Sequence, residues 1–203
     1  MKRPLLIATA ALLLLLAGCA TTIRSDVTTF HQWPAQMADK TYVFEAPPAA
    51  EDTLELHSYQ NLVRAELDRL GFHEASGKPA LTVSLHFMTT DIPVRVVELS
   101  YPMTYSHFGY WRPYWHGWYR PYYDPFWMGS PDWTERTVHN YQREVKVSIK
   151  SLADHKRLFD VTVRNTSRQM STPEMMPALV HSAFADFPGP SGTARTIELK
   201  KEG

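Results

Sequence analysis

Apolar and polar residues alternate along three stretches of the chain, at residues 81–87, 145–149 and 159–163. A period of two is typical of β-strands that bury one face and expose the other. The last two stretches are separated by the turn-forming residues 153–156, so they predict an antiparallel hairpin. Three shorter strands are expected at residues 27–30, 40–44 and 196–200.

Residues 53–70 have the spacing of an amphipathic helix. Asp52 and Glu55 at its start resemble a capping box. Gly71 can adopt the left-handed conformation that closes a helix, and Phe72 is placed for the apolar contact that accompanies such an end. The predicted buried face consists of Tyr59, Leu62, Val63, Leu67 and Leu70.

A second helix is expected to begin with Thr172 as N-cap and Pro173 at the first helical position. Residues 188–190, which read Pro-Gly-Pro, cannot continue it. The expected buried side chains of this helix are Met176, Leu179, Val180, Ala183, Phe184 and Phe187.

These elements follow one another as strands, helix, strands, helix and strand. The order predicts an α+β domain over residues 27–200, with two helices packed on one face of an antiparallel sheet. A chain of this length can bury one sizeable core.

The start of the chain has the arrangement of an export signal. Lys2 and Arg3 precede an apolar run that is shorter than the roughly 20 residues a membrane-spanning helix needs. Residues 16–19, Leu-Ala-Gly-Cys, resemble the lipobox of bacterial lipoproteins. We therefore expect residues 1–18 to be a signal peptide and Cys19, the single cysteine, to become the lipid-modified first residue. An ordinary secretory signal with an incidental cysteine is the alternative.

The lipobox resemblance also implies where the protein lies. It implies diacylglycerol on the sulfur of Cys19 and a further acyl chain on its amino group, and two or more chains anchor stably. Ala20 follows the cysteine, whereas an Asp there is the usual signal for inner-membrane retention in similar lipoproteins. We expect an outer-membrane protein that faces the periplasm, with residues 19–26 as its lipidated tether.

Charge and cysteine content exclude two classes of function. Without residues 1–18 the chain has 19 basic and 21 acidic side chains, so no basic excess is present to bind nucleic acid. Once Cys19 carries lipid, no thiol remains for a disulfide or a thiolate metal site.

Residues 100–134 differ from the rest of the chain in composition. They contain 14 of the 25 aromatic residues and five of the six tryptophans, with five prolines among them. Repeated proline disfavours a regular helix or a central strand, so an irregular or partly extended insertion is expected. Tyr and Trp rings together with Arg suit contact surfaces. The predicted contact residues are Trp111, Arg112, Tyr114, Trp115, Trp118, Tyr119, Arg120, Tyr122 and Trp127.

Several kinds of contact are compatible with this insertion. A protein partner or self-assembly surface ranks first, contact with the membrane surface second and glycan stacking third. Alternatively, the rings form a local cluster on the domain, or the segment is merely low in complexity.

No arrangement of residues indicates an enzyme. The chain lacks His-Glu-x-x-His, Gly-x-Ser-x-Gly and a glycine-rich phosphate loop, and its nine histidines are scattered. Acidic pairs such as Glu66 and Asp68 are explained by a solvated helix face. We expect no catalytic residue, no metal and no cofactor.

Five short motifs occur in a fixed order along the chain. They are Asp26-Val27 with Phe30 and Trp33, then residues 40–44, 70–72, 79–83 and 184–188. In this order they resemble the bacterial lipoproteins grouped under domain of unknown function 4136. The resemblance implies an α+β lipoprotein domain and supplies no catalytic residues.

These observations together predict a membrane-anchored, non-enzymatic envelope lipoprotein. It is expected to bind another component of the cell envelope, in assembly or maintenance of the outer membrane. The alternative is a lipoprotein that binds a glycan or a small ligand and uses the aromatic insertion as a stacking platform.

Overall fold

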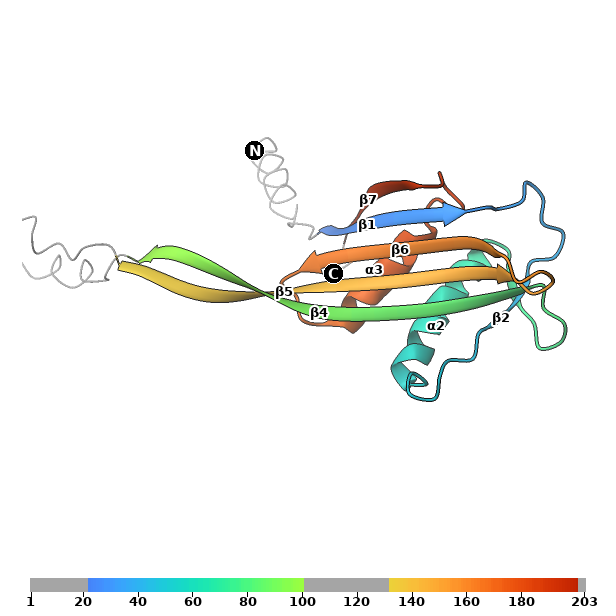
Figure 1. Cartoon of the computed structure of the whole chain (residues 1–203), viewed down its shortest axis with the longest axis horizontal. Helices are drawn as coiled ribbons and strands as arrows, with labels where there is room; N and C mark the ends of the chain where they lie inside the picture. The colour runs from blue at the N-terminus through green and yellow to red at the C-terminus, as the bar shows by residue number, and fades with distance from the viewer. Residues whose placement is uncertain (1–21, 101–131, 201–203) are drawn as a thin grey trace, which may run out of the picture. The chain divides into compact units, whose positions relative to one another are not determined.

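The computed structural model describes residues 22–100 and 132–200, which form an α+β fold of seven strands and two helices (Figure 1). This part of the chain divides into two compact units. We call the first, which runs to Thr90 and resumes at Tyr141, the domain. We call the second, residues 91–100 and 132–140, the ribbon, because it consists of parts of two neighbouring strands. In chain order the elements are β1 Thr22–His31, β2 Thr41–Phe44, α2 Leu54–Arg69, β3 His73–Glu74, β4 Leu81–Ser100, β5 Asp132–Ser151, β6 Arg157–Ser167, α3 Thr172–Phe184 and β7 Thr193–Lys200.

All the described strands join one sheet in the order β3-β2-β4-β5-β6-β1-β7. Strands β5, β6, β1 and β7 pair antiparallel, whereas β2 pairs parallel with both β3 and β4. The sheet is therefore mixed, and the prediction of an antiparallel sheet was wrong in this respect. The reason is that α2 carries the chain from the end of β2 to the start of β4, and a helical crossover brings the next strand back in the same direction.

The two helices cover one face of the sheet, and the hydrophobic core lies between them and the strands (Figure 1). Alternate residues of β4, β5 and β6 point into this core, which confirms the predicted period of two. Leu62, Leu70 and Phe187 are partly buried against the core. The almost fully buried side chains include Leu81, Val83, Leu85, Val145, Val147, Ile149, Phe159, Val161 and Val163 from the strands, and Tyr59, Val63, Leu67, Met176, Leu179, Val180, Ala183 and Phe184 from the helices.

Local hydrogen bonds set both ends of α2. Thr53, and not Asp52, is the N-cap, because its Oγ1 accepts from the backbone N–H of Leu56 at 3.1 Å. The predicted capping box of Asp52 and Glu55 was therefore wrong by one residue. Both Thr and Asp are good caps, and the observed start buries Leu56 against the sheet. At the other end Gly71 has a φ of +79° and closes the helix as predicted.

The start of α3 also differs from the prediction by one residue. The helix begins at Thr172 with Ser171 as N-cap, and Ser171 makes no side-chain capping bond. The Thr172 hydroxyl accepts instead from Nε of Arg143 at 3.2 Å. The Thr172 side chain, which the sequence predicted to cap the helix, thus binds Arg143 instead.

Two segments that were predicted to lie outside the strands contain strand residues in the structure. β1 begins at Thr22, earlier than the expected strand at 27–30, and Thr22 pairs with Lys200 of the edge strand β7. Residues 22–26 therefore belong to the sheet and not to a tether. In the same way β4 runs to Ser100 and β5 starts at Asp132, so the ends of the predicted irregular insertion continue the sheet.

Candidate functional site

The site residues predicted from the sequence lie outside the described chain. Cys19 falls within residues 1–21, and the aromatic contact residues from Trp111 to Trp127 fall within residues 101–131. The structure describes instead the start of β1, which follows Cys19, and the two strands of the ribbon, which lead into the aromatic insertion.

The ribbon exposes apolar side chains on both of its faces. Ile92 and Val94 alternate along β4 and share one face, whereas Val97 and Leu99 share the other. All four are exposed, and Val97 keeps an exposed fraction of 53%. Trp133 on β5 is exposed to 68%.

Two ion pairs join the strands of the ribbon. His139 Nδ1 lies 2.8 Å from a carboxylate oxygen of Asp91, and Arg136 Nη2 lies 3.6 Å from Glu98. Each of these exposed pairs contributes at most about 1 kcal/mol. They align the two strands but do not compensate for the exposed apolar side chains.

Tyr141, the first domain residue after the ribbon in sequence, lies at the end of the sheet where β1 begins. Ser167, the last residue of β6, lies opposite Tyr141 of β5. On the other side of β6, Nδ2 of Asn165 donates to the carbonyl oxygen of Arg24 at 2.7 Å, so the start of β1 lies at this same end (Figure 1). Cys19 lies three residues before β1, a stretch that spans at most roughly 11 Å.

A buried arginine fastens this end of the domain. Arg143 has no exposed surface, and burial lowers its pKa. Its Nε donates to Thr172 Oγ1 at 3.2 Å and its Nη1 to Ser167 Oγ at 3.1 Å. Two further bonds reach the carbonyl oxygens of Tyr141 and Gln169. Arg143 therefore ties β5 to the connection between β6 and α3.

A cleft of about 470 Å³ on the domain is the second candidate site. It lies beside the loop that follows β2, and side chains of β4, β5 and β6 contribute to its lining. Both signs of charge are present together with hydroxyl groups. The polar lining residues include Glu45, Glu51, Ser84, His86, Lys146, Ser148, Lys150 and Arg157.

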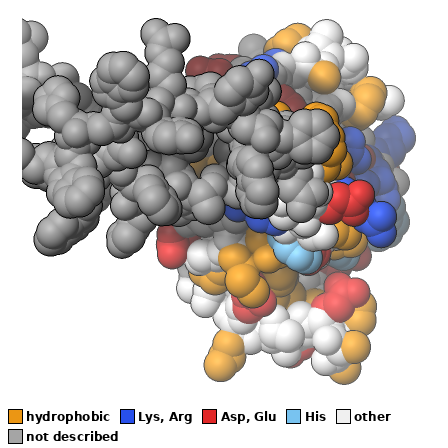
Figure 2. All heavy atoms as spheres, turned by 90° about the vertical axis from the view of Figure 1, so that its left-hand side faces the viewer, with side chains coloured by type: hydrophobic (Ala, Val, Ile, Leu, Met, Phe, Trp, Pro, Cys, Tyr) orange, Lys and Arg blue, Asp and Glu red, His pale blue; other side chains and the backbone are white. Residues whose placement is uncertain are grey.

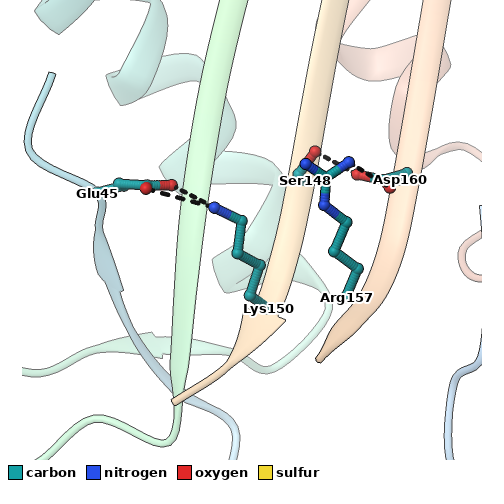
Figure 3. A network of polar contacts seen from close by, with 5 residues as sticks. All are labelled: Glu45, Ser148, Lys150, Arg157 and Asp160. Carbon is teal, nitrogen blue, oxygen red and sulfur yellow. Dashed lines mark hydrogen bonds and ion pairs between the residues drawn. The ribbon is translucent and has the colours of Figure 1, made fainter. Parts of the chain in front are cut away.

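Polar contacts join residues that line this cleft to one another and to Asp160, which lies outside the lining (Figure 3). Lys150 Nζ on β5 reaches past β4 to Glu45 at 2.9 Å. Asp160 on β6 accepts a hydrogen bond from Ser148 Oγ and pairs with Arg157 Nη1 at 3.3 Å. These side chains lie on the sheet face opposite α2, where alternate residues of the strands point away from the core (Figure 3).

One cation of the cleft keeps its charge free of local compensation. Lys150 and Arg157 each face a carboxylate, whereas Lys146 makes no ion pair with any residue that the structure describes. The charges on the wider surface are also mixed. Figure 2 shows acidic, basic and hydrophobic side chains next to one another on the visible part of one face.

Two features are absent from the described residues. Within residues 22–100 and 132–200, no group of three or more His, Cys, Asp or Glu side chains is placed to hold a metal ion. In the same two segments no helix is long and apolar enough to cross a membrane.

Sequence reasoning did not find the cleft. The alternation at Lys146, Ser148 and Lys150 predicts the solvent-facing side of a strand. It does not by itself indicate a binding site. Their partner Glu45 comes 105 residues before Lys150. Only the crossover through α2 brings that carboxylate beside β5.

A mixed sheet with two helices on one face defines an α+β protein. The chain belongs to the DUF4136 family, a domain of unknown function whose sequence profile matches residues 26–189. The family resemblance of the five sequence motifs is thereby confirmed.

Two solved structures show distant similarity. A PDZ domain protein from Parabacteroides distasonis is 13% identical with a TM-score of 0.49, and the match covers 89% of this chain and 40% of that one. This chain thus spans less than half of that protein. A PelC dodecamer from Paraburkholderia phytofirmans is 12% identical with a TM-score of 0.44, over 79% of this chain and 95% of that one. No curated protein matches the sequence.

Proposed function

We propose that this chain is a lipid-anchored, non-enzymatic protein of the bacterial outer membrane that faces the periplasm and binds another envelope component. The lipobox at residues 16–19 and the small residue Ala20 support the anchor and its location. A role in assembly or maintenance of the envelope follows from such a position.

The observation that carries the binding role is the exposure of the ribbon. Val97, Leu99 and Trp133 lie on strands that lead directly into the segment with most of the chain's aromatic residues. Large apolar side chains that remain exposed on paired strands are suited to an interface with a Trp-rich core and a polar rim.

Site-specific photocrosslinking in intact cells tests this proposal. A photoreactive residue in place of Val97 is expected to capture one defined envelope component. The control is the same residue in place of Leu54, which is 86% exposed on the domain and far from the ribbon in sequence. Equal capture from both positions, or none from the ribbon, contradicts the binding role.

The cleft supports a second candidate function, in which the lipoprotein binds a glycan or another small polar ligand. Ser84, Lys146 and Lys150 offer hydroxyl and ammonium donors, and Glu45 offers an acceptor, as a sugar with many hydroxyls requires. Aromatic residues of the insertion would supply stacking surfaces.

Titration with envelope glycan fragments, followed by amide chemical shifts, separates the two functions. Shifts around Ser84 and Lys146 that disappear in Lys146→Ala favour the glycan function. Lys78→Ala, an exposed lysine outside the cleft, is the matched control. Unchanged spectra at millimolar ligand exclude this candidate.

A further inference from the structure

The ribbon has more apolar surface than two strands can cover by themselves. Ile92 and Val94 occupy one face and Val97 and Leu99 the other, so neither face is polar throughout. A two-stranded hairpin open to water on both faces is marginally stable at best. Its apolar side chains therefore need a covering surface from outside the ribbon.

The proposed anchor would place a lipid surface near the end of the domain that leads into the ribbon. β4 and β5 pass from the domain into the ribbon after Thr90 and before Tyr141. The start of β1 lies at this end of the sheet, and Cys19 is only three residues, or roughly 11 Å, before it. Under the proposed function, the lipid attached to Cys19 is thus an apolar phase close to the end of the domain that leads into the ribbon.

The ribbon contains no basic cluster. Asp91 and Glu98 are paired with His139 and Arg136 across the two strands. Its remaining charged residues are Arg95, Asp132 and Glu135, so acidic residues outnumber basic ones. Attraction to anionic headgroups depends on a basic cluster, which the ribbon lacks. Contact with lipid has to come from apolar burial and from Trp133, a side chain suited to the headgroup layer.

We propose that the ribbon is a second membrane contact, which lies against the lipid surface that holds the Cys19 anchor. This inference rests on the proposed function, since it takes Cys19 as the anchored residue and names the bound component as lipid. Attachment through both the acyl chains and the ribbon raises the residence of the domain at the membrane above that from acyl chains alone.

An environment-sensitive fluorophore tests the contact directly. The chain from Ala20 contains every element described above and has no cysteine, so single labelling sites are clean. NBD on Val97→Cys is expected to shift to the blue when phosphatidylcholine vesicles are added. NBD on Leu54→Cys, the exposed domain site, should not shift. Binding should change by less than about twofold between roughly 0.1 and 1 M salt, because it does not depend on charge attraction.

Paired substitutions identify the face that contacts lipid. Vesicle sedimentation measures the affinity for lipid of two double variants, Ile92→Asp with Val94→Asp and Val97→Asp with Leu99→Asp. This affinity should fall at least about tenfold in one variant or in both. Leu54→Asp should bind as the parent chain does. Urea unfolding of the domain should not change in either double variant, because the ribbon is a separate compact unit.

The outcomes distinguish this inference from the proposed function. No blue shift at Val97→Cys, or undiminished vesicle binding by both double variants, overturns the lipid contact. If Val97 captures a protein in cells and NBD at Val97→Cys shows no blue shift with vesicles, the lipid contact is also contradicted. The proposed function would then still hold. Absence of lipid on Cys19 in the full-length chain contradicts the proposed function itself.

Discussion

Tyr42 is a fully buried tyrosine whose hydroxyl has no hydrogen-bond partner among the described residues. Its ring packs edge-on against Phe44 at 5.6 Å between centroids. Burial, and then the charges of Glu74 and Asp68, raise the pKa of Tyr42 to about 12. The ring stabilises the core, whereas the hydroxyl is desolvated without compensation.

Tyr42→Phe should therefore increase the free energy of unfolding by about 1 kcal/mol in urea denaturation at neutral pH. Tyr59→Phe is the matched control. The Tyr59 hydroxyl donates to Glu55 at 2.6 Å, so its loss should destabilise the protein. A destabilised Tyr42→Phe would mean that its hydroxyl has an effective partner in solution.

The pH dependence of Tyr42 follows from the same burial. Folding raises its pKa from 10.0 to about 12, so the folded state favours the neutral phenol. This contribution is complete below pH 10 and is lost as the pH rises to about 12. The loss amounts to about 2 to 3 kcal/mol. Alkaline titration of stability should be shallower for Tyr42→Phe, and identical profiles would argue against this tyrosine as the cause.

Arg143 contributes through its four neutral acceptors. Arg143→Ala leaves Ser167 Oγ and the carbonyl oxygens of Tyr141 and Gln169 without their donor, and we expect it to lower the free energy of unfolding by about 2 to 4 kcal/mol. Arg143→Lys should restore little, because an ammonium lacks the planar fork. Urea denaturation measures both, with the exposed Lys78→Ala expected to change stability by less than about 0.5 kcal/mol.

At the scale of elements, local patterns predicted most of the helices and strands. Local patterns predicted β4, β5 and β6 from a period of two, and α2 from helical spacing. Each pattern arises because one face of the element is buried and the other is exposed. The ends depend on more than local pattern. Thr53 and Asp52 are both good caps, and contacts of Leu56 with the core decide between them.

The ribbon and the domain should be separable. Replacement of residues 91–140 by Asn-Gly joins Thr90 to Tyr141 through a two-residue hairpin turn. The shortened chain should keep the domain's hydrogen-exchange protection and lie within about 1 kcal/mol of the parent in stability, because the core contains no ribbon residue. Loss of protection in β4 and β5 of the domain would show that the two units fold together.

At the scale of the whole molecule, the proposed lipid anchor on Cys19 leads to a prediction about where the domain resides. Cys19→Ser removes the thioether site, so metabolic labelling with palmitate should be lost and the protein should leave the outer-membrane fraction. The control is Ser25→Ala, which removes a buried hydroxyl without a partner in the described chain and should stay labelled. Labelling of Cys19→Ser at the parent level would exclude this cysteine as the anchor.

The candidate sites were predicted to different extents for a physical reason. Cys19 and the aromatic insertion are local signals, since a lipobox and a run of Trp and Tyr are complete within a few dozen residues. The cleft is not local. Glu45 follows β2, and Lys150 lies on β5. These two strands are separated in the sheet only by β4, so the long Lys150 side chain can reach Glu45.

The sequence by itself determined the family, the α+β class and the alternating faces of the core strands. Each of these depends on residue types at short spacing, which the chain shows directly. The tertiary structure decided the mixed sheet, the polar cleft and the end of the sheet that the start of β1 shares with Tyr141 of β5. These depend on which strands pair, and pairing is set by the burial of the whole core rather than by any single segment.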